Sequence, residues 1–391
     1  MSKLTKKELD DKGLVERTEE RVDRLYDEYE AIFIANSGGK DSGSVFNIVM
    51  EGYERNSHKI DHPIYNIFHD AESNPFPDTE AYFKRQARRW EDESHFFWSA
   101  VPYKISLMTH PEERAHNIPW NEDHVEDWCR PLPQWIDDYP NVELVRPDHP
   151  YLQGRYDFGS DQYVEIAYHI IEGFREEHGL AKDEVVNLVG LRAEESLNRY
   201  TTILNNGGFL KKDPNGSPCD IAHPVYDWGT KDLWTVHHEH DWDYTEFYDK
   251  MHQSGLASTK ARNGTPFGGH PISAKTPKLQ RHWEPELFTR WERRHPGAVL
   301  AFEFGFNLFG TDDAKADDQT WEEYAAQILN SFDEEDIERR TRLVEQRLQS
   351  HHDHASSALK EEEKCPVCKL SWKEMSRDLM SWLRDYKEDE H

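Results

Sequence analysis

The sequence predicts an α/β fold: an open parallel sheet with helices on both faces, followed by a helical C-terminal extension. Three apolar runs, at 31–35, 63–70 and 184–192, have the length and composition of buried strands. Segments with the apolar spacing of helices lie between them. Strands that alternate with helices along a chain form parallel sheets covered on both faces, and this alternation decides the fold class.

The elements follow in chain order. Residues 1–30 are charged and carry apolar residues at helical spacing, which predicts an N-terminal helix. The strand at 31–35 leads through a glycine-containing loop into a helix over 43–54, and the second strand is followed by a helix over 79–90. We therefore expect a strand, a loop and a helix to be repeated along this half of the chain.

The domain boundaries are predicted from composition. Residues 31–275 are expected to form one α/β domain, with a loop-rich insertion at about 105–160 that is rich in Trp, Pro and His. A dense run of Gly, Asn and Pro predicts a flexible loop at 205–220. Residues 276–391 are acidic and have mostly helical spacing, so a helical C-terminal region is expected.

The composition is strongly acidic, with a formal net charge of −29 over 391 residues. Such a surface repels nucleic acid and anionic membranes, so non-specific binding to either is not expected. The charge is typical of the cytosol of a halophilic host, or of a virus within one, and an acidic face that docks a protein partner is the alternative. The lack of an apolar signal core, the lack of an apolar run of ~20 residues and the use of only four cysteines predict a cytoplasmic protein with reduced thiols.

A loop poor in side chains joins the first strand to the next helix. It reads SGGKDS and consists of Ser37, Gly38, Gly39, Lys40, Asp41 and Ser42. Glycines let main-chain N–H groups approach a phosphate, the helix N-terminus favours an anion, and a lysine adds positive charge. The loop matches neither the GxxxxGK[ST] nor the GxGxxG pattern. The sequence thus predicts an anion-binding loop of another kind; a turn that needs glycine for its backbone angles is the alternative.

Several segments together resemble one superfamily. SGGKDS after an apolar strand resembles the pyrophosphate loop of the adenine nucleotide α-hydrolases, and the segments 68–85, 190–203, 223–236 and 247–268 resemble the branch of phosphoadenosine phosphosulfate (PAPS) reductase-like proteins. The last segment and the C-terminal CKLSWKEMSRDLMSWLRDY resemble the subgroup that includes the immunoglobulin-binding-regulator type. The resemblance implies a Rossmann-like fold, ATP or a PAPS-like adenine nucleotide with Mg²⁺ as cofactors, and cleavage of ATP between its α and β phosphates.

Residues after the third strand are candidates for the same site. Arg192 is expected at the carboxyl edge of the sheet, where open α/β sheets bind ligands, and Gly190 opens this stretch. Arg199 follows about two helical turns later, so both guanidinium groups are expected to share one helix face and to clamp a phosphate or sulfate. Glu194 and Glu195 are expected to orient the arginines or to help hold Mg²⁺. Surface ion pairs on a helix are the alternative.

Further candidates lie elsewhere in the chain. Asp70 and Glu72, at the end of the second strand, are candidates for binding ribose hydroxyls or Mg²⁺, with helix capping as the alternative. Asp41 is a candidate for orienting the loop or for holding Mg²⁺ on the phosphates. Arg262, in a glycine-rich segment, is a candidate for a lid over the phosphates.

The sequence departs from the reductases in one respect. It lacks the ECGxH-like segment that carries their catalytic cysteine, and sulfonucleotide reduction needs a thiolate near the transferred sulfur. The favoured function is cleavage of ATP to AMP and pyrophosphate to activate an unknown acceptor, in sulfur transfer or another pathway. A nucleotide-sensing regulator without turnover is the first alternative; a sulfonucleotide reductase or a DNA phosphorothioation component is the second.

A CPVC pair, Cys365 and Cys368, lies near the C-terminus, with His351 and His354 upstream. The spacing is compatible with a Cys2His2 zinc site. A redox pair, or no special role, are the alternatives.

Overall fold

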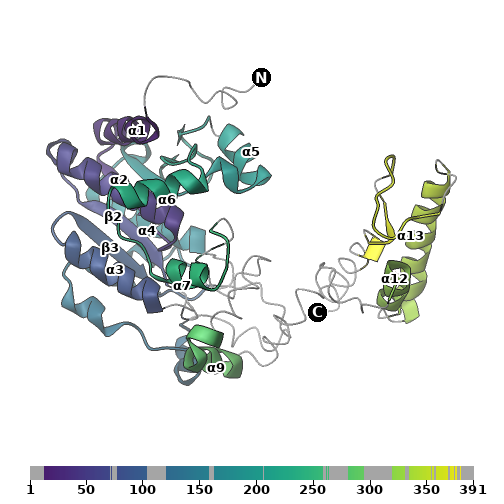
Figure 1. The fold of residues 1–391 in the computed structure, drawn as a ribbon. Coiled ribbons are helices and arrows are strands. Elements are labelled where there is room, and N and C mark those ends of the chain that lie inside the picture. Colours follow the sequence, from purple (N-terminus) through teal and green to yellow (C-terminus); the bar gives the residue numbers. More distant parts are fainter. Residues whose placement is uncertain are drawn as a thin grey trace. The chain divides into compact units, whose positions relative to one another are not determined.

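The computed structural model describes residues 13–70, 72, 77–103, 120–157, 163–205, 207–258, 261, 263, 281–294, 319–330, 334–353, 355, 358–368, 370–373, 375–376 and 379. The chain divides into two compact units, Met1–Arg294 and His295–His391 (Figure 1). The first contains the sheet, and the second is built around two helices. Among the described residues, none of the helices has the length and apolar character that crossing a membrane requires.

A seven-stranded sheet forms the centre of the first unit. Its strands are β1 (Ala31–Ala35), β2 (Ile64–His69), β3 (Ser94–Ser99), β4 (Val142–Val145), β5 (Val185–Val189), β6 (Leu210–Lys211) and β7 (Asp220–Ala222). The spatial order is β4-β3-β2-β1-β5-β7-β6, and every pairing is parallel except that of β6 with β7. The predicted fold class, an open parallel sheet, is confirmed.

Ten α-helices are described. They are α1 (Leu14–Glu28), α2 (Lys40–Asn56), α3 (Pro77–Arg89), α4 (Tyr163–His178), α5 (Leu197–Asn205), α6 (Thr230–Glu239), α7 (Phe247–Gln253), α9 (Pro285–Arg294), α12 (Trp321–Leu329) and α13 (Glu334–His352). Short 3-10 turns occur at Ser57–Lys59, Glu122–Asp127, Gln134–Asp138, Pro150–Leu152, Lys182–Glu184 and Ala193–Glu195.

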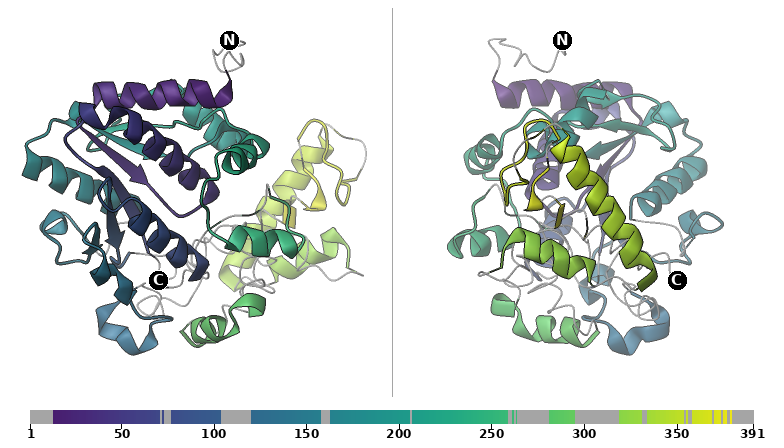
Figure 2. Two further views of the ribbon diagram at one scale, coloured as in Figure 1. Left: turned by 60° about the vertical axis from the view of Figure 1, so that its left-hand side comes forward. Right: turned by 90° about the vertical axis from the view of Figure 1, so that its right-hand side faces the viewer.

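Both faces of the sheet are covered, because side chains alternate along each strand. Ile32 and Ile34 of β1 pack in one apolar cluster with residues of α1, α2, α3 and α6. Ala31 and Phe33 point to the other face and pack with α4, whose Phe174 ring lies 5.1 Å from the Phe33 ring. The views in Figure 2 show these two helical layers on opposite sides of the strands.

Two segments expected to be loops contribute strands. Within 105–160, β4 pairs in parallel with β3 and so belongs to the sheet. Within 205–220 the chain forms β6 and reaches β7, and Cys219, expected in a flexible loop, is fully buried against the α4 layer. These strands are two to four residues long, too short for the alternation of side chains to be recognised in the sequence.

The strand order places a topological switch point between β1 and β5. From β1 the chain proceeds outward through β2, β3 and β4, and it then crosses to β5 on the other side of β1. The loops that follow β1 and β5 therefore leave the sheet in opposite directions from adjacent carboxyl ends. In open α/β sheets this divergence creates the crevice where ligands bind.

Candidate functional site

The loop after β1 turns sharply before α2 begins. Gly38 has a φ angle of +68°, in the left-handed region that side chains disfavour. A Cβ atom at this position would lie 2.8 Å from Thr79 Cγ2 of α3 and 3.0 Å from the Phe83 ring. Gly39 is the N-cap residue of α2, and Lys40 begins the helix. Glycine is required at position 38 by both its backbone angle and the close approach of α3.

The loop amides point at oxygen atoms of the protein itself. Four consecutive N–H groups donate to side-chain oxygens: Ser37 to Ser42 Oγ (3.2 Å), Gly38 to Asn36 Oδ1 (3.0 Å), Gly39 to Ser37 Oγ (3.3 Å) and Lys40 to the Tyr248 hydroxyl (2.8 Å). The Asp41 and Ser42 N–H groups have no acceptor among the residues that the structure describes. The sequence suggested that the loop N–H groups are free to bind an anion. In the structure, the first four of them already donate to oxygen atoms of the protein.

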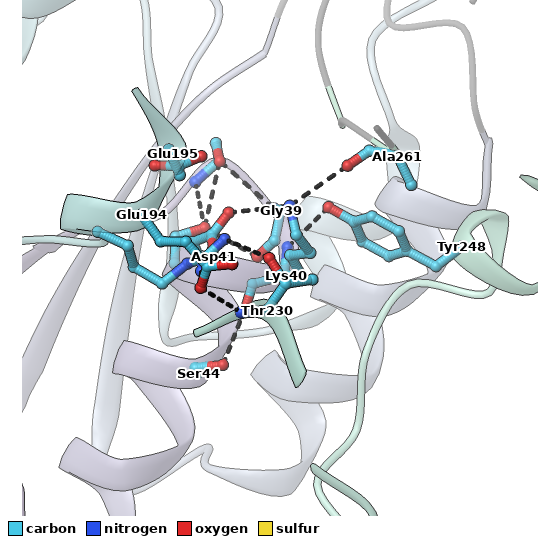
Figure 3. Close-up of polar contacts among 12 residues, drawn as sticks. Gly39, Lys40, Asp41, Ser44, Glu194, Glu195, Thr230, Tyr248 and Ala261 are labelled. Carbon is cyan, nitrogen blue, oxygen red and sulfur yellow. Dashed lines mark hydrogen bonds and ion pairs between the residues drawn. The ribbon is translucent and has the colours of Figure 1, made fainter. Parts of the chain in front are cut away.

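Three charged side chains form a buried network beside these amides (Figure 3). The Lys40 side chain is buried, and its Nζ donates to Asp41 Oδ2 at 3.1 Å and to the Ala261 carbonyl at 3.3 Å. Asp41 Oδ1 accepts a hydrogen bond from Arg192 Nε. Burial alone would raise the pKa of Asp41, but the charges of Lys40 and Arg192 and their hydrogen bonds hold it below its usual range. Asp41 therefore stays ionised at neutral pH.

Arg192 joins the end of β5 to this network. Its guanidinium is 1% exposed and donates to the Trp228 carbonyl at 3.1 Å and to Thr230 Oγ1 at 3.4 Å. Gly190 brings the two strand ends together, because a Cβ atom there would lie 2.7 Å from the Asp41 carbonyl carbon and from the Ser42 nitrogen. The switch point is therefore closed by direct contact between the loop after β1 and the end of β5.

The prediction that Arg192 and Arg199 share one helix face is wrong. Arg192 has extended backbone angles and precedes a 3-10 turn, while α5 begins only at Leu197. The segment 192–199 is not one helix, so the spacing argument does not apply. Arg199 is exposed and forms an ion pair with Glu195, whose side chain is only 3% exposed, so the pair is not the surface ion pair on a helix that was the alternative. Glu194 accepts a hydrogen bond from the Thr230 N–H at 2.9 Å, and its Oε2 also lies 3.8 Å from Arg192 Nη1.

Asp70 and Glu72 are fully buried and bind protein groups. Asp70 accepts hydrogen bonds from Trp98 Nε1 at 3.1 Å and from Arg130, and Glu72 accepts them from the main-chain N–H groups of Trp120 and Cys129. Burial raises the pKa of Asp70 to about 6 against the opposing charge of Arg130. These carboxylates hold the 120–130 segment on the end of β2, an arrangement that neither ligand binding nor helix capping anticipated.

The structure adds two residues that sequence reasoning missed. The Tyr248 hydroxyl of α7 caps the Lys40 amide, as described above. His237 of α6 lies 2.9 Å from Ser44 Oγ through its Nε2, and burial lowers the pKa of His237 to about 4, so the ring is neutral at physiological pH. Tyr248 stands in the 247–268 segment that resembles the family, but the segment gave no role for its hydroxyl, and His237 stands in no such pattern.

Arg262 and His354 lie outside the described residues. Ala261 and Asn263, on either side of Arg262, both contact the loop: the Ala261 carbonyl accepts from Lys40, and Asn263 Nδ2 donates to the Ser37 carbonyl at 2.9 Å.

Three of the four residues predicted to bind zinc lie together in the second unit. One donor atom each from His351, Cys365 and Cys368 lies within 4.8 Å of the others. This group could hold a metal ion.

Comparisons with known proteins complete the description of the site. No family model matches the sequence. The chain is 26% identical over 343 residues to the uncharacterized protein YbdN of Escherichia coli K12, and the alignment covers 83% of this chain and 77% of that protein.

Solved structures with a similar fold include two proteins of known activity. One is the PAPS reductase of Candida auris in a phosphate complex, with 12% identity, a TM-score of 0.32, and coverage of 60% of this chain and 84% of the reductase. Another is the U34-tRNA thiolase NcsA of Methanococcus maripaludis with its [4Fe-4S] cluster, with 12% identity, a TM-score of 0.34, and coverage of 75% and 78%. At these low identities and TM-scores, the likenesses do not decide the activity of this chain.

Replacing Gly190 tests the contact between the two strand ends. We expect Gly190→Ala to lower the free energy of unfolding by about 1–3 kcal/mol, because the added Cβ forces the Asp41 backbone to shift. Gly13→Ala is the control, since a Cβ there meets nothing within 4 Å and the backbone angle is not strained. Equal stability of the two variants in urea denaturation would contradict the close approach.

Removing the Arg192 charge tests the buried network. Arg192→Gln leaves Asp41 without its guanidinium partner, so we expect a loss of about 3–5 kcal/mol in the free energy of unfolding. The double variant Arg192→Gln, Asp41→Asn removes both charges and is expected to recover part of that loss. A double-mutant cycle measured by chemical denaturation gives the coupling; strictly additive effects would show that the pair is not coupled.

Proposed function

We propose that the 37–42 loop and Arg192 bind the phosphates of an adenine nucleotide, and that the protein cleaves ATP to AMP and pyrophosphate to activate an acceptor substrate. One observation carries the proposal: the buried Lys40–Asp41–Arg192 network stands at the N-terminus of α2, at the switch point between β1 and β5. The superfamily resemblance of the SGGKDS loop points to the same ligand.

The charge of the network suits an anion. Two buried cations surround the Asp41 carboxylate, and the second carboxylate beside them, Glu194, is more than half exposed and lies 3.8 Å from Arg192, so the positive charge is concentrated in the buried part of the group. The N-terminus of α2 adds the partial positive charge of its dipole and the unengaged N–H groups of Asp41 and Ser42. A phosphate placed here would be stabilised by Lys40, by the helix dipole and by the Asp41 and Ser42 N–H groups, which have no acceptor among the described residues.

The nucleotide is expected to bring Mg²⁺ with it. Both carboxylate oxygens of Asp41 are occupied, one by Arg192 and one by Lys40. Mg²⁺ is usually held by substrate phosphates with one or two carboxylates, so Asp41 would contribute only after one of these bonds is exchanged. When bound, Mg²⁺ would neutralise charge on the phosphates and polarise the bond between the α and β phosphates.

The two thiols of the first unit, Cys219 and Cys129, favour ATP cleavage over sulfonucleotide reduction. Cys219 precedes the parallel strand β7 and therefore lies at the opposite edge of the sheet from the loop. Burial raises the pKa of the Cys219 thiol to about 12, so the reactive thiolate is not populated at neutral pH. Cys129 is also fully buried.

Nucleotide binding requires the Tyr248 hydroxyl to leave the Lys40 amide. This hydroxyl comes from α7, whereas the other three acceptors belong to the loop or to the residue just before it. Its oxygen stands where an oxygen of a bound phosphate would accept the same hydrogen bond. We therefore propose that α7 covers the loop in the free protein and moves when the nucleotide enters.

Turnover is tested with purified protein, ATP and Mg²⁺ at high salt. We expect AMP and pyrophosphate as products, at a rate that rises when the true acceptor is supplied. ATP binding without any AMP, whatever acceptor is tried, would favour a nucleotide sensor over an enzyme. Absence of ATP binding would overturn the proposal.

Lys40→Ala tests the phosphate contact. We expect ATP affinity, measured by calorimetry, to fall about 10- to 100-fold, because a charge-assisted hydrogen bond in a buried site is lost. Lys59→Ala is the matched control: Lys59 follows the same helix and pairs with Asp27 at 2.7 Å, away from the loop. Circular dichroism confirms that both variants fold. Unchanged affinity in folded Lys40→Ala would remove the loop from the proposed site.

Tyr248→Phe tests whether α7 covers the 37–42 loop in the free protein. The variant loses the hydroxyl that satisfies the Lys40 amide but keeps the ring, so the free state becomes less stable relative to the bound one. We expect ATP to bind about 2- to 10-fold more tightly, the equivalent of one hydrogen bond. Weaker binding would instead show that the Tyr248 hydroxyl contacts the nucleotide.

A further inference from the structure

The end of α13 and the chain that follows it form a compact knuckle in the second unit. The main chain of 360–365 folds back on 370–373: Cys365 N donates to the Leu370 carbonyl, and Trp372 N donates to the Lys360 carbonyl, each at 2.9 Å. The Cys365-Pro-Val-Cys368 turn lies at the closed end of this hairpin-like segment. Leu359 and Leu370, on its two arms, are buried in the core of the unit.

Three metal-ligating side chains converge at this knuckle. His351 stands in the last turn of α13 and is 3% exposed, and its Nδ1 lies 3.3 Å from Cys368 Sγ. With the thiol of Cys365, the three donor atoms lie within 4.8 Å of one another. They come from two elements that approach each other only in the folded unit, and the two cysteines are half-buried.

We propose that His351, Cys365 and Cys368 bind a structural Zn²⁺ ion. In a tetrahedral zinc site with ligand bonds of about 2.0–2.3 Å, the ligand atoms are about 3.5–3.8 Å apart. The observed separations therefore need only small side-chain adjustments. Two thiolates and one imidazole are the ligands that zinc prefers, and a water molecule or another side chain completes the tetrahedron. Binding displaces the two thiol protons, so affinity falls as the pH is lowered.

The second unit gains a cross-link from such an ion. Among the described residues of this unit, nine buried side chains form one apolar cluster, most of them from α12, α13 and the segment after the knuckle. Small units commonly gain stability from a metal or a disulfide. The ion would tie the end of α13 to the knuckle, where the C-terminal end of the helix dipole also favours a cation. This role is independent of nucleotide binding in the first unit.

The metal content of the full chain tests the proposal. Protein purified under reducing conditions is expected to contain about one Zn²⁺ per chain by mass spectrometry of the metal. Replacing zinc by Co²⁺ should give intense visible bands of tetrahedral cobalt and thiolate-to-cobalt charge-transfer bands in the near ultraviolet. These spectra are measured on the wild-type chain, so they do not depend on whether a variant folds.

Variants assign the ligands. Cys365→Ser, Cys368→Ser and His351→Asn are each expected to lower zinc affinity at least about tenfold in a competition with a chromophoric chelator. His352→Gln is the control, because His352 is the next residue of the same helix but is exposed; it should bind zinc like the wild type.

Three results would overturn the assignment. They are a reduced wild-type chain that takes up neither Zn²⁺ nor Co²⁺, a Cys365–Cys368 disulfide that forms in the purified chain and is unaffected by added zinc, and zinc loss from His352→Gln as large as that from His351→Asn. The first two would assign the pair no metal role or a redox role. The third would show that the His351 imidazole is not a specific ligand of the zinc ion.

Discussion

The fold of the first unit depends on the mutual burial of Lys40, Asp41 and Arg192. A buried charge without a partner is costly, so none of the three can be placed here alone. Satisfying them brings together four parts of the chain: the start of α2, the end of β5, the turn before α6 through the Trp228 carbonyl and Thr230, and the backbone at Ala261. The same contacts fix the loop conformation that the proposed phosphate site requires.

The charge of the whole chain differs from the charges that surround the proposed phosphate site. The chain carries a large formal negative charge, which by itself would repel a nucleotide. The two cations are buried beside a helix N-terminus, whereas Glu194, the second carboxylate near them, is more than half exposed. Solvent and salt therefore screen the positive charges little. An acidic protein can therefore present an anion site without a basic surface. In the second unit, the zinc site that we propose would serve stability.

The sequence predicted the sheet, its first strands and the loop, because long apolar runs and a glycine loop are local signals. It also predicted correctly that Arg192 lies near the loop, since the ends of adjacent parallel strands meet at one edge. It failed for Arg199, where Ser196 interrupts the expected helix. It also failed for Asp70 and Glu72, whose partners lie 28 to 60 residues away in the sequence. The role of Tyr248 was missed for the same reason: its segment resembles the family, but its contact with Lys40 spans 208 residues and is not visible in a local pattern.

The segment that we propose covers the loop, α7 with Asp243 just before it, is attached to α3 by ion pairs. These ion pairs differ from those of the buried Lys40–Asp41–Arg192 network. Lys250 pairs with Asp78, and Arg85 pairs with Asp243, all with partly exposed side chains. Dissolved ions weaken such solvent-facing pairs, whereas the enclosed network around Asp41 is shielded from them. Rising ionic strength should therefore loosen the cover while leaving the phosphate contacts intact. Salt concentration would then control access to the site: the fraction of molecules in which α7 has moved away from the loop would be larger at high salt than in dilute buffer.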